Sequence, residues 1–118
     1  MTKPGDRVGA ILSGTGGDNP TVQFLGYGTY VGDEVPDADA AGWVAEALRE
    51  AGATNPKSVL DNGDVVWGCE CWFGEESAFD RRFAGCERIP ATIGEVRAAY
   101  REAGVEPYAA EHRPGGER

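Results

Sequence analysis

The residues best suited to chemistry are concentrated in one stretch, VVWGCECWFG, at residues 65–74. This stretch holds two of the three tryptophans and two of the three cysteines, with Glu70 between Cys69 and Cys71. Thiolates bind metals or act as nucleophiles, carboxylates transfer protons, and indole rings stack on flat ligands. The cysteines therefore have three interpretations: a metal site, a redox pair, or part of the hydrophobic core.

Side-chain alternation along a strand favours the core interpretation. In one continuous strand, the following residues share a wholly apolar face: Val65, Trp67, Cys69, Cys71 and Phe73. Two such cysteines would have Cα atoms about 6.5–7 Å apart and parallel side chains, which does not suit a disulfide. Glu70 and Trp72 take the opposite face. We therefore expect buried, structural cysteines and a Trp72 that walls a ligand groove.

A zinc site can be assembled only by adding Cys86 and His112, the remaining thiol and the single histidine, to Cys69 and Cys71. This set lacks the CxxC spacing common in structural zinc sites, and the histidine falls in the polar tail. For catalysis, the acids available are Glu70, Asp61 and Asp64, without a nucleophile, base or phosphate motif beside them. We expect neither a cofactor nor an enzymatic activity, and a zinc-stabilised domain and a small enzyme are the weaker alternatives.

Length and charge narrow the function classes further. The chain has 118 residues, enough for one domain, and a formal net charge of −9 from 11 basic and 20 acidic residues. Binding to a nucleic-acid duplex needs clustered basic residues, so we do not expect it. No apolar run approaches the roughly 18 residues of a membrane span, and no secretory signal is evident. The odd number of cysteines indicates a reducing compartment, so we expect a cytoplasmic protein.

Hydrophobic periodicity predicts the elements that must position these residues. We expect one α+β domain over residues 1–104 and a polar, flexible tail over residues 105–118. Its strands are predicted as one hairpin at 6–12 and 21–32, a second across 57–73 that turns at Asn62-Gly63, and a fifth strand at 86–90. Its helices are predicted from Asp37 or Asp39 to Ala51, within 74–85, and at 92–104, where Thr92 and Glu95 form a capping box. Together these elements form a small bent antiparallel sheet or partial barrel, with one inserted helix and two C-terminal helices.

Glycines in the strand at 21–32 suggest where a ligand groove would lie. Gly26, Gly28 and Gly32 share one face, and glycines in a strand mark a bend or the close approach of a backbone or ligand. They either let the sheet bend around a tryptophan or form the floor of a groove. The candidate ligand-binding residues are aromatic, basic or acidic: Tyr27, Tyr30, Trp72, Phe73, Glu70, Arg81, Arg82 and Arg97.

Three sequence blocks resemble a known set of proteins. GDRVGAIL, VQFLGYGTYVGDEVP and NPKSVLDNGDVVWGCECWFGEE are similar to blocks of small uncharacterised proteins of tailed phages, prophages and their bacterial hosts. The resemblance covers about residues 5–76, and Phe73 stands where that set has a second tryptophan. That set has no established activity. It implies a phage accessory protein, which binds a host protein or sequesters a host signal.

Two hypotheses follow for the function. The first is a counter-defence protein that sequesters a small nucleotide-like host signal by aromatic stacking and arginine contacts. In this hypothesis Arg97, on an amphipathic terminal helix, could complete a pocket across a homodimer or a higher homo-oligomer. The alternative is an acidic protein-interaction module that inhibits a host protein through its surface.

Overall fold

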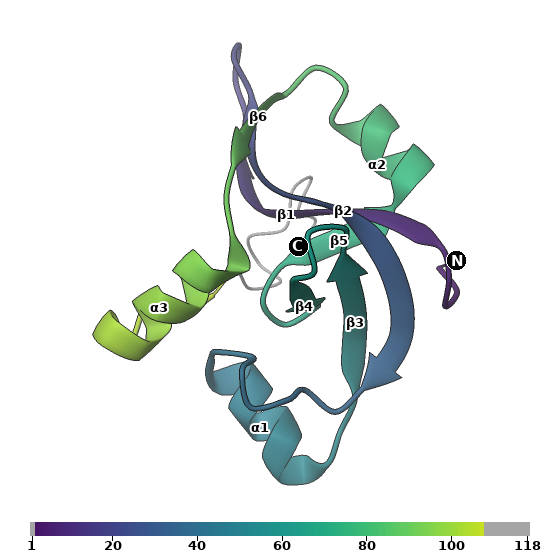
Figure 1. Ribbon diagram of the computed structural model, residues 1–118. Helices are drawn as coiled ribbons and strands as arrows, with labels where there is room; N and C mark the ends of the chain where they lie inside the picture. Colours follow the sequence, from purple (N-terminus) through teal and green to yellow (C-terminus); the bar gives the residue numbers. More distant parts are fainter. Residues whose placement is uncertain (1, 108–118) are drawn as a thin grey trace.

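The protein is an α+β fold built on one open sheet, and Figure 1 shows its computed structural model. The structure describes residues 2–107. In that range the elements are β1 (Arg7–Thr15), β2 (Thr21–Glu34), α1 (Trp43–Ala51), β3 (Asn55–Leu60), β4 (Val65–Trp67), β5 (Trp72–Glu75), α2 (Glu76–Arg82), β6 (Glu87–Pro90) and α3 (Ile93–Ala103). The predicted fold class is confirmed, and the sheet does not close into a barrel.

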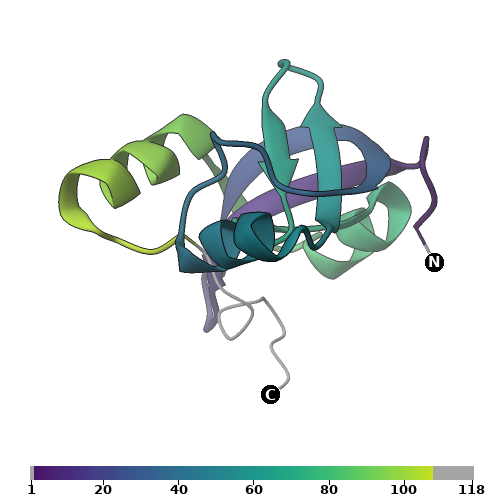
Figure 2. The same ribbon diagram turned by 90° about the horizontal axis from the view of Figure 1, so that it is seen from below.

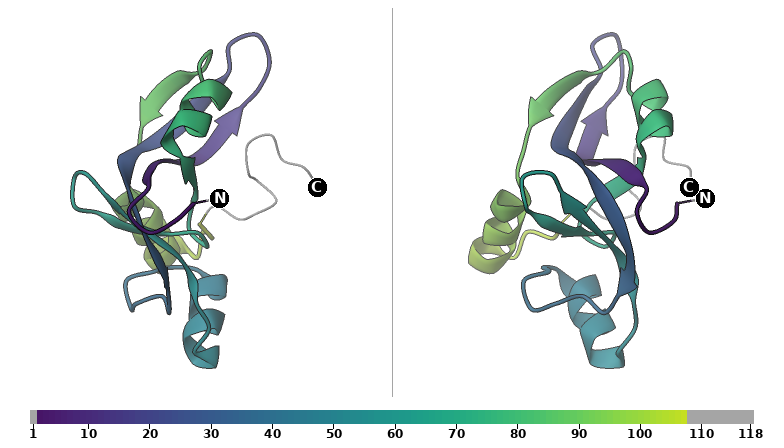
Figure 3. Two further views of the ribbon diagram at one scale, coloured as in Figure 1. Left: turned by 90° about the vertical axis from the view of Figure 1, so that its right-hand side faces the viewer. Right: turned by 45° about the vertical axis from the view of Figure 1, so that its right-hand side comes forward.

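The strand order is β4-β3-β2-β1-β5, and all four of these pairings are antiparallel. β6 pairs with the first part of the long strand β2, and this pairing is parallel, at Thr21–Phe24. The predicted first hairpin, β1–β2, is present. It projects beside β6 at one end of the molecule, and Figure 3 shows α1 at the opposite end.

The glycines of β2 let the sheet bend and its strands approach closely, which is the first of the two explanations given for them above. A Cβ on Gly28 would lie 2.4 Å from the carbonyl oxygen of Val59, because β3 approaches closely there. Gly26 and Gly32 have φ angles of 133° and 112°, and each lies at an irregularity in the pairing of β2 with a neighbour. Only glycine adopts such angles without strain, so these positions let the long strand bend.

The predicted continuous strand through residues 65–73 is wrong. β4 ends at Trp67, whose carbonyl accepts hydrogen bonds from the N–H groups of Glu70 (2.8 Å) and Cys71 (3.2 Å). The chain thus turns, and β5 pairs with β1 rather than continuing beside β3. The side chain of Asn55 fixes the turn by accepting the N–H of Cys69 at 2.8 Å. The turn resets the alternation, so VVWGCECWFG does not have the two continuous faces that were predicted.

β1 is the centre of the core because it is buried on both faces from Val8 to Leu12. On one face Ala10 and Leu12 join Leu25, Leu60, Val66 and Cys71 against Ile93 and Val96 of α3. On the other face Ile11 and Val22 pack with Phe79 of α2 and with Phe83, the residue that follows this helix. The sheet therefore has one helix on each face, as Figure 1 shows for α2 and α3.

Helix α1 docks on a third, smaller cluster, in which Ala40 and Ala45 pack against Trp67. The helix starts at Trp43, later than predicted, because the side chain of Asp37 closes a turn by accepting the N–H groups of Asp39 and Ala40. None of the described helices is long and apolar enough to cross a membrane.

Helix α3 begins as predicted. The hydroxyl of Thr92 accepts the N–H of Glu95 at 3.3 Å, which is the hydrogen bond expected of a helix N-cap. Gly104 ends the helix in the left-handed conformation, at φ 69°. Figure 2 shows α1 and α3 on neighbouring sides of the molecule, where they enclose the pocket described next.

Candidate functional site

A pocket of about 630 Å³ lies between the sheet, the start of α1 and the outer part of α3. Its size falls within the range of small-ligand sites, roughly 300–1,000 Å³. Most of the side chains around it are apolar. It is lined by Leu12, Ser13, Gln23, Gly42, Trp43, Val44, Cys69, Ala91, Glu95, Val96, Ala99, Val105, Glu106 and Pro107.

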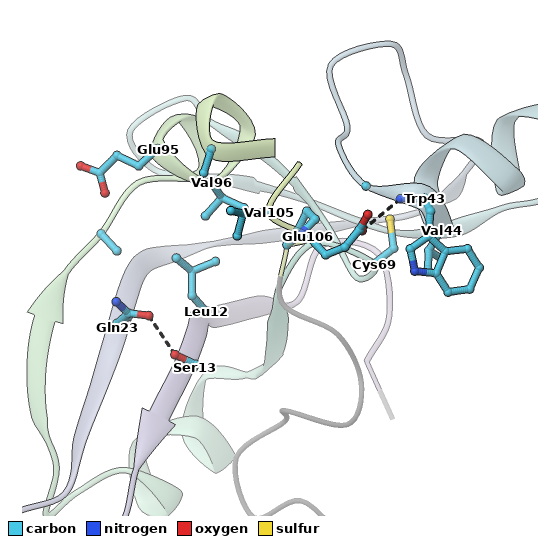
Figure 4. Close-up of a pocket in the computed structure, with 14 residues that line it drawn as sticks. Leu12, Ser13, Gln23, Trp43, Val44, Cys69, Glu95, Val96, Val105 and Glu106 are labelled. Carbon is cyan, nitrogen blue, oxygen red and sulfur yellow. Dashed lines mark hydrogen bonds between the residues drawn. The ribbon is translucent and has the colours of Figure 1, made fainter. Parts of the chain in front are cut away.

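The segment after α3 closes one side of the pocket. Beyond Gly104 the chain reverses, and Figure 4 shows Val105 and Glu106 between α3 and Trp43. The Glu106 carboxylate accepts the backbone N–H of Trp43 at 3.1 Å, which satisfies a free donor at the start of α1. Residues 105–107, predicted as part of the tail, thus contact the domain, while residues 108–118 lie outside the described range.

The rim of the pocket is acidic. Glu95 and Glu106 line it and are both exposed, and within residues 2–107 no lysine or arginine lines it. The other polar side chains are neutral: the Ser13 hydroxyl donates to the Gln23 side-chain oxygen at 2.8 Å. The arrangement suits a ligand that buries an apolar group and carries positive charge at its edge.

The thiol of Cys69 in the pocket is held in its protonated form. Burial, followed by the nearby charge of Glu70, raises the pKa of Cys69 from an ordinary 9.0 to about 11. At neutral pH the thiol is protonated, and only the thiolate is a strong nucleophile. Cys69 is therefore a packing residue of the pocket wall.

The three cysteines lie in three different apolar clusters. Cys71 belongs to the cluster under α3, Cys86 packs beside Phe79 under α2, and Cys69 lies near Trp67. Among the residues that the structure describes, no three histidine, cysteine or acidic side chains are close enough to hold a metal ion. His112, the fourth ligand of the hypothetical zinc site, lies outside these residues.

Two of the predicted ligand-binding residues pair with each other inside the fold. Glu70 is 0% exposed, and its carboxylate accepts two hydrogen bonds of 2.8 Å from the Arg97 guanidinium. It also accepts the N–H of Ala41 at 2.8 Å, and Arg97 donates to the carbonyl of Val65 at 2.9 Å. The bond to Glu70 raises the pKa of Arg97. The pair joins α3 to the β4–β5 turn and to the segment before α1.

Trp72 packs under α2 rather than along an open groove. Its ring stacks on Phe79 at a centroid distance of 6.2 Å and meets Phe83 edge-on at 5.7 Å. The Arg82 guanidinium lies 5.6 Å from the Trp72 ring centroid. The neighbouring Arg81 is exposed in the last turn of the same helix.

Tyr27 belongs to a polar group on the same side of the sheet. Its hydroxyl donates to Asp80 at 2.6 Å and accepts from Arg88 at 2.7 Å. The Arg88 guanidinium also lies over the rings of Phe24 and Phe79, at 4.9 and 5.3 Å. Arg88 was not among the arginines predicted from the sequence to bind a ligand, yet it contacts Tyr27, Asp80 and two aromatic rings.

Tyr30 and Phe73 lie apart from the residues around α2. Their ring centroids are 6.4 Å apart, and the Tyr30 hydroxyl donates to Asp33. Asp61, one of the acids considered for catalysis, forms two hydrogen bonds of 2.8 and 2.6 Å with Arg7, which lower its pKa. The eight predicted residues thus form small separate groups rather than one site, and none of them lines the pocket.

The pocket itself was missed by sequence reasoning. Trp43 falls within the helix that was predicted to end at Ala51, and in the structure it is 63% exposed. That exposure depends on where α1 docks, and its only sequence signal is the presence of a tryptophan within a predicted helix.

Comparisons with protein-family models, with curated proteins and with solved structures found no match.

Proposed function

We propose that the protein is a non-enzymatic, cytoplasmic binding protein that docks a partner protein at the pocket between α1, α3 and the β1–β2 hairpin. The observation that carries this proposal is the apolar pocket itself, with Trp43 and Val105 at its margin, 63% and 55% exposed. Exposed apolar side chains beside a pocket are typical of interaction sites, and tryptophan is enriched among the residues that dominate binding energy. The proposal corresponds to the protein-interaction alternative of the sequence analysis.

The biological setting of the proposal comes from the resemblance to phage-borne proteins. In that setting the partner is a host protein, and docking inhibits or redirects it. The acidic surface supports a protein partner over a nucleic-acid duplex, because a net charge of −9 repels phosphate.

A displayed library of random 12-residue peptides tests the docking function. It is selected on the wild-type protein and counter-selected on Ala99→Trp, which fills the pocket from α3. Ala103→Trp is the matched control, because Ala103 is exposed on the same helix and does not line the pocket. We expect enriched peptides that bind the wild type and the control but not the filled variant. Failure to enrich any such peptide, with both variants folded by circular dichroism, contradicts the proposal.

The second candidate is sequestration of a small nucleotide-like ligand, supported by the basic and aromatic residues around α2. Arg81 is exposed there, and Arg82 lies over the ring of Trp72. Such a ligand would place phosphate on the arginines. A panel of mononucleotides and cyclic dinucleotides, added in a thermal-shift assay, tests it. A rise in melting temperature that Arg81→Glu abolishes and Ala99→Trp leaves unchanged would favour this candidate over peptide docking.

A further inference from the structure

We infer that the pocket takes a segment of the partner protein in which an apolar anchor side chain is accompanied by a nearby lysine or arginine. This inference rests on the proposed docking function and names the chemistry of the segment that docks. It follows from the contrast between the walls of the pocket and its rim.

The walls select an apolar anchor. Leu12 rises from the sheet, Val96 and Ala99 come from α3, and Val105 returns from the segment after that helix, as Figure 4 shows for the labelled residues. These side chains offer no charge to an inserted group. An aliphatic or aromatic side chain is therefore the group that gains most free energy by leaving water there.

The rim selects positive charge. Glu95 and Glu106 come from different segments, and Figure 4 places Glu106 nearer to Trp43 than Glu95. In the described part of the chain, neither carboxylate forms an ion pair with a lysine or arginine. A basic residue beside the anchor would be attracted to this rim, while a phosphate or carboxylate would be repelled.

The surface beside the pocket favours a protein segment. Trp43 and Val105 line the pocket but are also largely exposed, so an occupant that covers their exposed parts must reach past the anchor group. A second copy of this chain is a poor occupant, because the molecule carries a net charge of −9 and would bring like charges to an acidic rim. Charge complementarity thus assigns the site to a basic segment of another protein.

The tightest-binding peptide from the selection above is the probe for the test. It is compared with an analogue in which each arginine is replaced by citrulline and each lysine by norleucine, which remove the charge and keep much of the shape. An exposed ion pair contributes about 0.2–1 kcal/mol, or about 1.4- to fivefold in affinity, so two carboxylates predict an analogue about two- to thirtyfold weaker. Glu95→Gln should weaken the charged peptide by about 1.4- to fivefold and the neutral analogue by less than that.

Glu102→Gln is the matched control, since Glu102 is exposed on α3 outside the pocket lining, and it should leave the affinity unchanged. Selected peptides without basic residues, or equal affinities of the charged and neutral peptides, would overturn the inference while leaving the docking function standing. A salt titration tests the same charge contribution: the charged peptide should weaken with added salt and the neutral one should not. If no peptide distinguishes the wild type from Ala99→Trp, the docking function and this inference fail together.

Discussion

The buried ion pair between Glu70 and Arg97 gives the most direct test of the structure. We predict that Arg97→Met strongly destabilises the protein. Methionine keeps an unbranched stem of similar length but removes the charge and all the donors. The variant leaves Glu70 at a position that is 0% exposed, with one of its three hydrogen bonds remaining, from the N–H of Ala41.

The expected magnitude follows from that geometry. Removing one partner of a buried ion pair costs about 3–5 kcal/mol, because the remaining charge is desolvated without compensation. Here the carbonyl of Val65 also loses its hydrogen bond from Arg97. A domain of this size has a free energy of unfolding of about 5–15 kcal/mol, so the loss is a large fraction of the total.

Urea unfolding followed by tryptophan fluorescence measures the change, with the slope of the transition checked for constancy. The control is Arg101→Met, the same replacement at an exposed position of α3, which should change stability by less than about 0.5 kcal/mol. Adding Glu70→Gln to Arg97→Met should restore at least about 1 kcal/mol, since it removes the unpaired charge. A loss below about 1 kcal/mol in the single variant, or no recovery in the double variant, would refute the ion pair as described.

Three further predictions concern single positions. Gly28→Ala should lower the free energy of unfolding by about 2–3 kcal/mol, because the new Cβ would lie 2.4 Å from the backbone of β3. The control is Gly16→Ala, whose Cβ would point into open space and should change the free energy of unfolding little. Urea unfolding measures both variants. Cys69 should react with iodoacetamide at pH 8 at least about tenfold more slowly than a free thiol. Burial raises the pKa of the Cys69 thiol to about 11, so the folded state holds this proton more tightly than the unfolded state does. The stability that the buried neutral thiol contributes is therefore present below pH 9 and is lost as the pH rises from 9 to 11. Urea unfolding of the wild type and of Cys69→Ser at pH 8 and at pH 10.5 measures this loss. Trp67→Ala and Trp72→Ala should each destabilise the protein by about 3–5 kcal/mol; a Trp72→Ala variant as stable as the wild type would show that its ring is not held by α2.

Local patterns in the sequence were sufficient for most of the elements. Alternation predicted the β1–β2 hairpin, helical spacing predicted α2 and α3, and Thr92 marked the start of α3, because each signal depends on residues within a few positions. The same argument failed at residues 68–71. The turn there depends on Asn55, which is distant in sequence, and on the pairing of β5 with β1.

Composition determined that the chain is a small acidic domain with enough apolar residues for a core, and hydrophobic periodicity determined its α+β class. Tertiary structure decided which polar residues remain available for binding. Glu70 and Arg97, 27 positions apart, meet inside the fold, because a charge can be buried only beside its partner. The pocket likewise joins Leu12, Trp43, Val96 and Glu106 from four segments of the chain. No spacing within one element links these residues, so only the packing of α1 and α3 against the sheet brings them together.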